Sequence, residues 1–554
     1  MSAVLTERES PQPAVVPQQT FDVVIAGAGF AGMYMLHKMR QRGLSVRLYE
    51  AGGGVGGTWY WNRYPGARVD IESVEYAYSF CEELQQEWTW SERYASQAEL
   101  LRYANHVVDR FGLRPDMQFD TKVTAAIYDT AARRWNIRTS RGEHISAKYC
   151  ILATGFLSAA NKPDFAGMDS YEGKQYQTSH WPHEGVDFTG QRVAMIGTGS
   201  SAVQCIPIIA QQAKHLFVFQ RTPSFSIPLR NAPMDRDYER RVKAEYTEWR
   251  RREREESRAG FIALNYAPAA PNDKSALEVS VEERLQDYET RWRSGGLCFY
   301  SSYIDLLTNL EANETLAEFV RAKIGQKVHD PAVAELLAPK DYPILAKRLC
   351  ADTNYYETYN RDNVTLVSIK DSPIEKLTPK GLQVRDREYA VDSIIFATGF
   401  DAVTGAIKNI DIRGREGKRL SDHWVGAPRA YLGLMSAGFP NLFFLDGPCS
   451  NGALVSPMLL SEYQVEWVDR CIQHLGTGSR TCIEAQLTPE DEWMNHMNTV
   501  SDGSLLYLAN SWYMGANIPG KPRALLAYLG GLTNYKQQCE QGEANGYGNF
   551  VVSH

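Results

Sequence analysis

The chain has 554 residues, a formal net charge of -7 and nine cysteines that form no CxxC pair. A chain above about 250–300 residues exceeds one hydrophobic core, so two or three domains are expected. The negative charge disfavours nucleic acid and anionic membranes as partners, no apolar run is long enough to span a bilayer, and the scattered cysteines predict reduced thiols in the cytoplasm.

The first twenty residues, MSAVLTERESPQPAVVPQQT, contain three prolines and several charges. They lack the apolar stretch of a signal peptide. We therefore predict a disordered tail over residues 1–20.

A nucleotide-binding unit comes next in FDVVIAGAGFAG, where an apolar run leads into Gly27, Gly29 and Gly32. Glycines at this spacing permit a tight turn and bring backbone amides close to a pyrophosphate at the start of a helix. The next strand-like run, SVRLYE, ends in Glu50, which is placed to accept hydrogen bonds from ribose hydroxyls. A dinucleotide site is therefore predicted here.

The stretch YEGKQYQTSHWP, residues 171–182, lies between two glycine-rich signatures and is predicted to be neither strand nor helix. His180 and His183 have the spacing of an HxxH metal pair. Trp-Pro between them precludes a regular helix and no third ligand is evident, so no metal site is predicted.

A second unit, RVAMIGTGSSAVQ, has Ala202 where the third glycine of the signature would stand. Its next strand, HLFVFQRT, ends in Arg221 rather than an acid. A guanidinium binds a 2′-phosphate through two charge-assisted hydrogen bonds, which favours NADPH over NADH. The alternative is that Arg221 is an ordinary solvated charge. The predicted cofactor-binding residues of this unit are Gly197, Thr198, Gly199, Ser200, Ser201, Gln204, Arg221 and Thr222.

Each unit ends in a similar stretch, YCILATGF at Phe156 and SIIFATGF at Phe400. The interval from Gly197 to the second stretch is much longer than the interval from Gly27 to the first. An insertion over about 231–345 explains the difference. It begins with a charged run, residues 234–258, predicted to form exposed helices because its acids and bases alternate. The later stretch FPNLFFLDGP, residues 439–448, resembles the strand that closes a flavin-binding domain, which implies that the first domain binds FAD and is discontinuous. The predicted fold is α/β with two nested Rossmann-like domains: FAD-binding at 21–157 and 398–554, and NADP-binding at 158–397 with the helical insertion.

No redox cysteine pair comes after the first unit, which argues against a disulfide reductase. Residues 56–70 read GGTWYWNRYPGARVD instead, and YEGKQYQTSHWP aligns with the fingerprint FxGxxxHxxxW at Gly173 and Trp181, with Pro182 next. In these motifs the chain resembles the type I Baeyer–Villiger monooxygenases. The resemblance extends over essentially the whole chain and implies an enzyme that converts a ketone to an ester or lactone with NADPH and O2, through a flavin C4a-peroxide.

Two fingerprint positions depart from the family pattern. Tyr171 stands where Phe is usual, and Gln177 where His is usual. In the family this segment lies at the junction of the two nucleotide domains and couples cofactor movement to catalysis. Gln keeps a donor and an acceptor but does not titrate, so the departure bears on coupling efficiency more than on reaction class.

The resemblance also implies roles for further residues. In PKDYPILAKRLC, Arg348 is the expected catalytic arginine, which stabilises negative charge on oxygen, and Lys347 contacts the NADPH phosphate. Asp70 lies near the flavin and orients Arg348, although the two could form a plain structural ion pair. Trp512, in SWYMGANIPGKPR, packs over the cofactor or the ketone, or is a core aromatic. The flavin contacts implied by the first motif are Gly57, Thr58, Trp59 and Asp70.

Two other functions stay open at this point. One is an N-hydroxylating or related flavin monooxygenase. The other is an uncoupled flavin reductase that only consumes NADPH. The expected partners are a ketone and O2, and the sequence leaves the identity of the ketone and the oligomeric state open.

Overall fold

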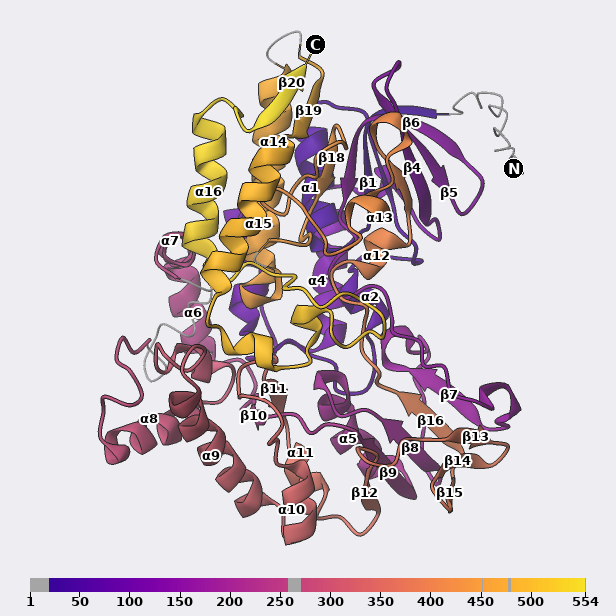
Figure 1. Cartoon of the computed structure of the whole chain (residues 1–554), viewed down its shortest axis with the longest axis vertical. Coiled ribbons are helices and arrows are strands. Elements are labelled where there is room, and N and C mark those ends of the chain that lie inside the picture. The colour runs from indigo at the N-terminus through magenta and orange to yellow at the C-terminus, as the bar shows by residue number, and fades with distance from the viewer. Residues whose placement is uncertain (1–18, 258–270, 451, 477–479, 554) are drawn as a thin grey trace, which may run out of the picture.

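The computed structural model describes residues 19–257, 271–450, 452–476 and 480–553. Two lobes, each built around a sheet, lie one above the other in Figure 1. The predicted disordered tail lies outside the described residues except for Gln19 and Thr20, which already belong to the first strand. None of the described helices is both long and apolar enough to cross a membrane.

The upper lobe contains an eight-stranded sheet in the order β17-β4-β5-β6-β1-β2-β3, with β18 paired to β6. Its strands are β1 (Gln19–Ala26), β2 (Val46–Tyr49), β3 (Met117–Gln118), β4 (Val123–Asp129), β5 (Arg134–Thr139), β6 (His144–Leu152), β17 (Asp411–Arg413) and β18 (Leu442–Phe444). Strands β2, β1, β6 and β18 run parallel, so their carboxyl ends meet at one edge. Helices α1 (Phe30–Gln41) and α14 (Pro457–Gly476) pack against each other beside this sheet.

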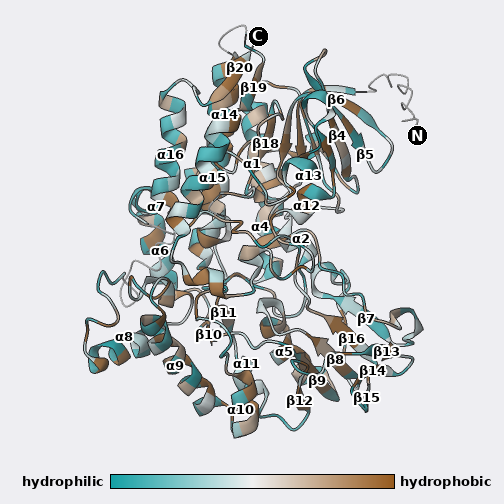
Figure 2. Ribbon diagram, in the orientation of Figure 1, coloured by the Kyte–Doolittle hydropathy of each residue, from teal (hydrophilic) through white to brown (hydrophobic). Residues whose placement is uncertain are grey.

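The lower lobe contains a five-stranded parallel sheet in the order β12-β9-β8-β16-β7. Its strands are β7 (Lys174–Gln177), β8 (Arg192–Ile196), β9 (His215–Gln220), β12 (Val364–Ser368) and β16 (Ser393–Phe396), and helix α5 (Ser200–Gln212) comes after β8. Figure 2 shows hydrophobic residues along the strands of both sheets. The chain thus has the expected α/β fold with two Rossmann-like sheets.

Strand β7 corrects the prediction that residues 171–182 form no strand. Lys174–Gln177 pairs in parallel with β16 at the edge of the sheet. The sequence KQYQ lacks the apolar alternation of a half-buried strand, so its conformation comes from backbone pairing with β16 rather than from its own pattern.

Among the described residues, five helices lie in the chain between β10 (Ser226–Pro228) and β11 (Cys350–Asp352): α6 (Arg236–Ala244), α7 (Tyr246–Glu255), α8 (Val281–Ser294), α9 (Leu310–Lys327) and α10 (Pro331–Leu337). The charged run forms α6 and α7, so it is helical as predicted. The prediction that these helices are exposed is wrong. Arg250 and Glu253 are buried and form an ion pair of 2.7 Å, and Arg254 lies 3.5 Å from Glu462 of α14. Charge pairing permits this face of α7 to be buried against the upper lobe.

The remaining elements complete the two lobes and the segments between them. The helices are α2 (Thr58–Trp61), α3 (Glu82–Glu87), α4 (Gln97–Arg110), α11 (Tyr355–Thr358), α12 (Gly405–Lys408), α13 (Leu420–His423), α15 (Leu487–Ser501) and α16 (Leu532–Ala544). The strands are β10 (Ser226–Pro228), β11 (Cys350–Asp352), β13 (Lys376–Thr378), β14 (Gly381–Val384), β15 (Arg387–Ala390), β19 (Cys482–Ala485) and β20 (Phe550–Ser553). The chain crosses between the sheets after β6 and after β16, and the two crossings meet in a bridge between Ala160 and Phe400.

Candidate active site

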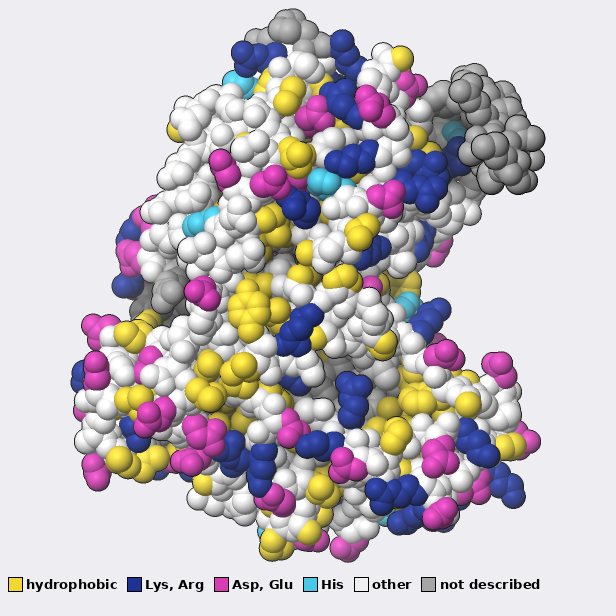
Figure 3. Space-filling model, viewed as in Figure 1, with side chains coloured by type: hydrophobic (Ala, Val, Ile, Leu, Met, Phe, Trp, Pro, Cys, Tyr) yellow, Lys and Arg dark blue, Asp and Glu magenta, His cyan; other side chains and the backbone are white. Residues whose placement is uncertain are grey.

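A cavity of about 720 Å³ is lined by residues of both lobes. This volume lies within the range of small-molecule sites, roughly 300–1,000 Å³. Figure 3 shows that the surface is hollowed where the two lobes meet. The predicted site residues in its wall are Gly27, Gly29, Glu50, Gly57, Thr58, Trp59, Asp70, Gly199, Ser200, Ser201, Gln204, Lys347, Arg348 and Trp512. Five predicted residues lie outside the wall: Gly32, Gly197, Thr198, Arg221 and Thr222.

The first glycine turn comes directly after β1 and is built by close backbone contact. Gly27 has φ +110°, and a Cβ there would lie 2.3 Å from the carbonyl oxygen of Ala153. A Cβ at Gly32 would lie 1.9 Å from the carbonyl oxygen of Gly27. Gly32 therefore shapes the turn from behind, which explains why it does not face the cavity.

Glu50 is held against this turn. Its Oε2 accepts a hydrogen bond of 2.7 Å from the amide of Ala28, and its Oε1 accepts one of 2.8 Å from the amide of Gly52. Burial raises the pKa of Glu50 despite these bonds. Each carboxylate oxygen can accept one more hydrogen bond, so Glu50 can still accept hydrogen bonds from ribose hydroxyls at the cavity wall.

The second glycine turn has the same construction. Gly197 has φ +112°, and a Cβ there would lie 2.5 Å from the carbonyl oxygen of Ala397. The hydroxyl of Thr198 donates to the carbonyl oxygen of Thr222 at 3.0 Å. These residues therefore build the turn, while Ser200 and the first turn of α5 face the cavity.

Asp70 and Arg348 meet in the cavity although 278 positions separate them in the chain. Arg348 donates from Nε to Oδ2 at 2.6 Å and from Nη2 to Oδ1 at 2.8 Å. Burial disfavours the charge of Arg348, but Asp70 outweighs burial, so the pKa of Arg348 lies above its ordinary value. The result is a permanent positive charge with a fixed orientation.

Lys347 and Arg221 form a second positive region beside the cavity. The Nζ of Lys347 lies 4.1 Å from the ring centre of Tyr342. Burial, and then the nearby charge of Arg221, lowers the pKa of Lys347. Arg221 itself is exposed. Two cations that influence each other electrostatically form a favourable site for a phosphate group.

The fingerprint segment lies where the two chain crossings run together. Gln177 donates from Nε2 to the carbonyl oxygen of Asn161 at 3.2 Å, and the hydroxyl of Thr398 donates to the same oxygen at 2.6 Å. Gln177 therefore makes a hydrogen bond at the junction of the two lobes.

The other fingerprint residues are packed around this junction. Tyr171 is buried and donates from its hydroxyl to the carbonyl oxygen of Val391 at 3.0 Å, so the extra oxygen relative to Phe has a partner. Trp181 is 3% exposed. The ring of His180 lies 5.1 Å from that of Trp61, which brings the segment against α2.

The histidines of the HxxH spacing contact aromatic rings. His183 lies 5.1 Å from the ring of Tyr60, as His180 does from Trp61. Among the described residues, no group of three or more His, Cys, Asp or Glu could hold a metal ion.

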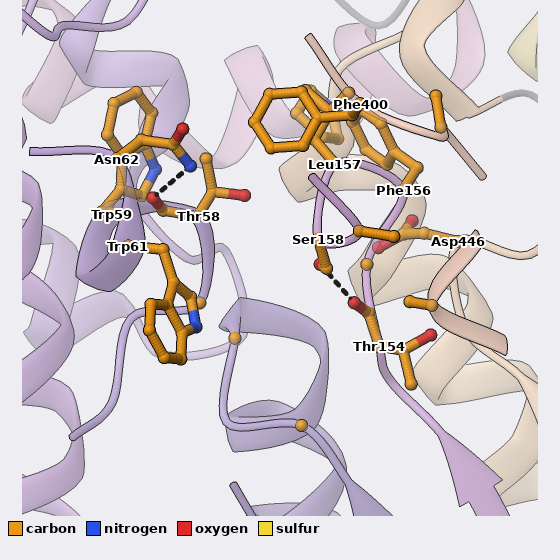
Figure 4. A pocket seen from close by; sticks show the side chains of 18 of the residues that line it. Thr58, Trp59, Trp61, Asn62, Thr154, Phe156, Leu157, Ser158, Phe400 and Asp446 are labelled. Atoms are coloured by element: carbon orange, nitrogen blue, oxygen red, sulfur yellow. Dashed lines mark hydrogen bonds between the residues drawn. The ribbon is translucent and has the colours of Figure 1, made fainter. Parts of the chain in front are cut away.

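Several cavity residues were not predicted. In Figure 4, the unpredicted Trp61 and Asn62 form one wall together with the predicted Thr58 and Trp59. The unpredicted residues across the cavity from them are Thr154, Phe156, Leu157, Ser158, Phe400 and Asp446. Phe156 and Phe400 end the two ATGF stretches, so the internal repeat was the signal that could have identified them. The ring of Trp512 stacks on that of Phe156, with centroids 6.4 Å apart and planes at 9°.

Comparisons with known proteins agree with this arrangement. Residues 24–248 match the family described as pyridine nucleotide-disulphide oxidoreductase. The chain is 42% identical over 551 residues to the 2-oxo-Δ3-4,5,5-trimethylcyclopentenylacetyl-CoA monooxygenase of Pseudomonas putida, covering 96% of this chain and 98% of the relative. It is 41% identical to a Baeyer–Villiger monooxygenase of Pseudooceanicola batsensis, covering 96% of each.

A solved structure described as oxidized steroid monooxygenase bound to NADP has a TM-score of 0.91 and 48% identity, covering 96% of this chain and 99% of that one. These matches cover nearly the full length of the chain, and so include both sheets. The chain belongs to the Baeyer–Villiger monooxygenases, flavoenzymes that use FAD and NADPH.

Proposed function

We propose that this chain inserts one oxygen atom of O2 beside the carbonyl of a ketone, giving an ester or lactone, at the part of the cavity where Arg348 lies. The observation that carries the proposal is the bidentate pair of Arg348 and Asp70 in a cavity lined by both nucleotide-binding lobes. Incubation with NADPH and a panel of cyclic and linear ketones, with product analysis, tests it. Peroxide formation without ester from every ketone would instead support the uncoupled reductase.

The residues of the cavity fit the two cofactors of the family. The turn at Gly27 and Gly29 admits a pyrophosphate because no side chain occupies it, and Glu50 is placed for the ribose. Thr58 and Trp59 lie farther along the same wall, on α2. FAD held by these residues would supply the flavin chemistry that carries reducing equivalents from NADPH to O2.

Arg348 supplies positive charge where oxygen becomes negative. Attack on the carbonyl carbon places negative charge on the carbonyl oxygen, and a guanidinium whose orientation is already fixed stabilises that charge without reorganising. The pair is half-buried at the cavity wall, with 20% of the Arg348 side chain and 27% of the Asp70 side chain exposed, so it can be reached by a ligand in the cavity. Asp70 accepts two hydrogen bonds from Arg348 and therefore acts as the residue that orients it.

We propose that residues 21–157 with 398–554 bind FAD and that residues 158–397 bind NADP, as the sequence predicts. Strands β17 and β18 return to the first sheet after the second sheet is complete, which supports a discontinuous first domain. All nine cysteines are free thiols, which supports a cytoplasmic location.

Arg221→Ala is expected to raise the KM for NADPH about 10- to 100-fold and to change the KM for NADH little. The variant loses a charge-assisted hydrogen bond to the 2′-phosphate, which NADPH has and NADH lacks, so its affinity for NADPH falls. Steady-state kinetics with both nucleotides measures the difference. Arg230→Ala, which removes an exposed arginine outside the cavity, is the matched control. Equal losses for NADPH and NADH would show that Arg221 does not contact the phosphate.

Gln177→Ala is expected to increase the share of NADPH that ends as hydrogen peroxide, with ester formation reduced about 5- to 10-fold. The variant loses a hydrogen bond to Asn161 at the junction, worth roughly 1 kcal/mol. Peroxide and ester are measured in the same reaction. Gln175→Ala on the same strand is the control, because Gln175 is exposed and its side chain donates to the carbonyl of Met168 rather than to the junction. If Gln177→Ala forms the same shares of peroxide and ester as the unaltered chain, Gln177 does not support the coupling of NADPH oxidation to ester formation.

A further inference from the structure

Tyr342 contacts Lys347, one of the two cations of the expected phosphate site. The Nζ of Lys347 lies 4.1 Å from the centre of the Tyr342 ring, well within the range of about 6 Å in which a ring face attracts a cation. Tyr342 itself is 9% exposed and does not line the cavity. It therefore touches a residue of the site from behind, without belonging to the wall.

The hydroxyl of the same tyrosine reaches the segment that carries the other cation, Arg221. It donates to the carbonyl oxygen of Pro223 at 3.0 Å and accepts a hydrogen bond of 3.3 Å from the amide of Phe225. Tyr342 and Pro223 are 119 positions apart in the chain. One side chain thus connects the two segments that supply positive charge.

A strained turn brings Lys347 back over the ring. Leu345, between Tyr342 and Lys347, has φ +67°, in the left-handed region that side chains other than glycine rarely adopt. Asn313 of α9 fixes this turn, because its side chain donates to the carbonyl oxygen of Ile344 at 2.8 Å and accepts from its amide at 3.0 Å. Strained backbone persists only where the surrounding contacts hold it, and it gathers at functional sites.

A ring, rather than a carboxylate, holds Lys347. Among the described residues, no acid forms an ion pair with it, and the nearby Asp341 is paired with Lys370 at 2.7 Å. A carboxylate would fix the ammonium group, but its negative charge would also repel a phosphate. The face of a ring attracts the ammonium group and leaves its full charge for an anion.

The contact also restricts a flexible side chain before any nucleotide binds. Lysine has a long stem with several rotatable bonds, and ordering it on binding costs entropy. An ammonium group already held against a buried ring loses less freedom when a phosphate arrives. The ring therefore favours binding of a phosphate beside Arg221 without touching the phosphate itself.

We propose that Tyr342 is a positioning residue for the 2′-phosphate of NADPH: its ring holds Lys347, and its hydroxyl fixes the ring to the segment that follows Arg221. The preference for NADPH over NADH then depends on Tyr342 as well as on the two cations. This inference rests on the proposed function, which places NADPH at Arg221.

The test compares two ligands that differ by one phosphate group, adenosine 2′,5′-bisphosphate and adenosine 5′-monophosphate. Their binding to the FAD-loaded protein is measured by isothermal titration calorimetry. Tyr342→Leu is expected to raise the Kd for the bisphosphate about 3- to 30-fold, because Lys347 loses the ring that holds it. The Kd for the monophosphate is expected to stay the same.

Two further variants separate the ring from general damage. Tyr342→Phe keeps the ring and loses only the hydroxyl, so its Kd for the bisphosphate is expected to stay within about 3-fold of that of the unaltered chain. Tyr389→Leu is the matched control, because Tyr389 is 8% exposed and its ring centre lies 4.5 Å from the guanidinium of Arg387, in the lower lobe but outside the cavity wall. It is expected to leave both Kd values unchanged.

A double-mutant cycle shows whether Tyr342 acts through Lys347. Lys347→Met removes the charge, so adding Tyr342→Leu to it is expected to cause no further loss of bisphosphate affinity. Steady-state kinetics gives a second readout. In Tyr342→Leu the KM for NADPH is expected to rise by the same factor as the Kd, with kcat and the KM for NADH little changed.

Thermal unfolding with FAD bound shows that each variant is folded. If Tyr342→Leu does not fold, Tyr342→Met fills more of the space without a ring and carries the same expectation. Three results in a folded variant would overturn the inference: an unchanged Kd for the bisphosphate, equal losses for both ligands, or additive losses in the cycle. If the unaltered chain binds both ligands equally well, the proposed NADPH site is itself wrong, and the role of Tyr342 is wrong with it.

Discussion

Arg348→Ala is expected to reduce ester formation at least about 100- to 1,000-fold while the flavin is still reduced by NADPH. Loss of a positioned donor to a developing oxyanion typically costs this much in turnover. Among the described residues of the cavity, only Arg348 forms an ion pair with Asp70. Anaerobic reduction by NADPH, monitored optically, and ester yield in air measure the two steps separately.

Arg348→Lys is the control for charge. An ammonium keeps the positive charge but cannot form the two parallel hydrogen bonds with Asp70, so partial activity is expected. Normal ester yield from Arg348→Ala would refute the catalytic assignment. Equal loss of flavin reduction and ester formation would mean that Arg348 serves nucleotide binding instead.

Asp70→Ala is expected to reduce ester formation about 100-fold, because Arg348 loses the carboxylate that fixes its orientation. A displacement of about 1 Å in a catalytic group can cost this much. Peroxide release is expected to rise as ester formation falls. The measurement is the ratio of peroxide to ester at saturating NADPH.

Asp70→Asn separates orientation from charge. It keeps an oxygen acceptor for one of the two hydrogen bonds, so its loss is expected to be smaller than that of Asp70→Ala. If both variants lower thermal stability but keep the normal ratio of peroxide to ester, the pair is purely structural.

Local patterns identified much of the fold. The glycine turns at Gly27 and Gly197 are readable because a tight turn between strand and helix needs glycine wherever a Cβ would meet backbone. The interval from Gly197 to the second ATGF stretch is longer than that from Gly27 to the first, and this difference indicated the insertion that contains the helices between β10 and β11.

Other features depend on contacts distant in sequence. Strand β7 exists because β16 pairs with it, and the buried face of α7 exists because Glu462 of α14 lies beside it. The contact between Asp70 and Arg348 was predicted from the family resemblance, because no local pattern links residues so far apart in the chain. The stretch FPNLFFLDGP was recognised as the strand that closes the first sheet, but nothing in it identified Asp446 as a cavity residue, because a single carboxyl after a strand is indistinguishable in sequence from a solvated one.

The most direct test of the account is one reaction containing the FAD-loaded protein, NADPH, a ketone that gives product and ¹⁸O2. NADPH oxidation, peroxide, and the mass of the ester are measured together. The account predicts one ester per NADPH, one ¹⁸O atom in each ester and little peroxide. Stoichiometric peroxide without labelled ester, across the ketone panel, would contradict it and leave a flavin reductase.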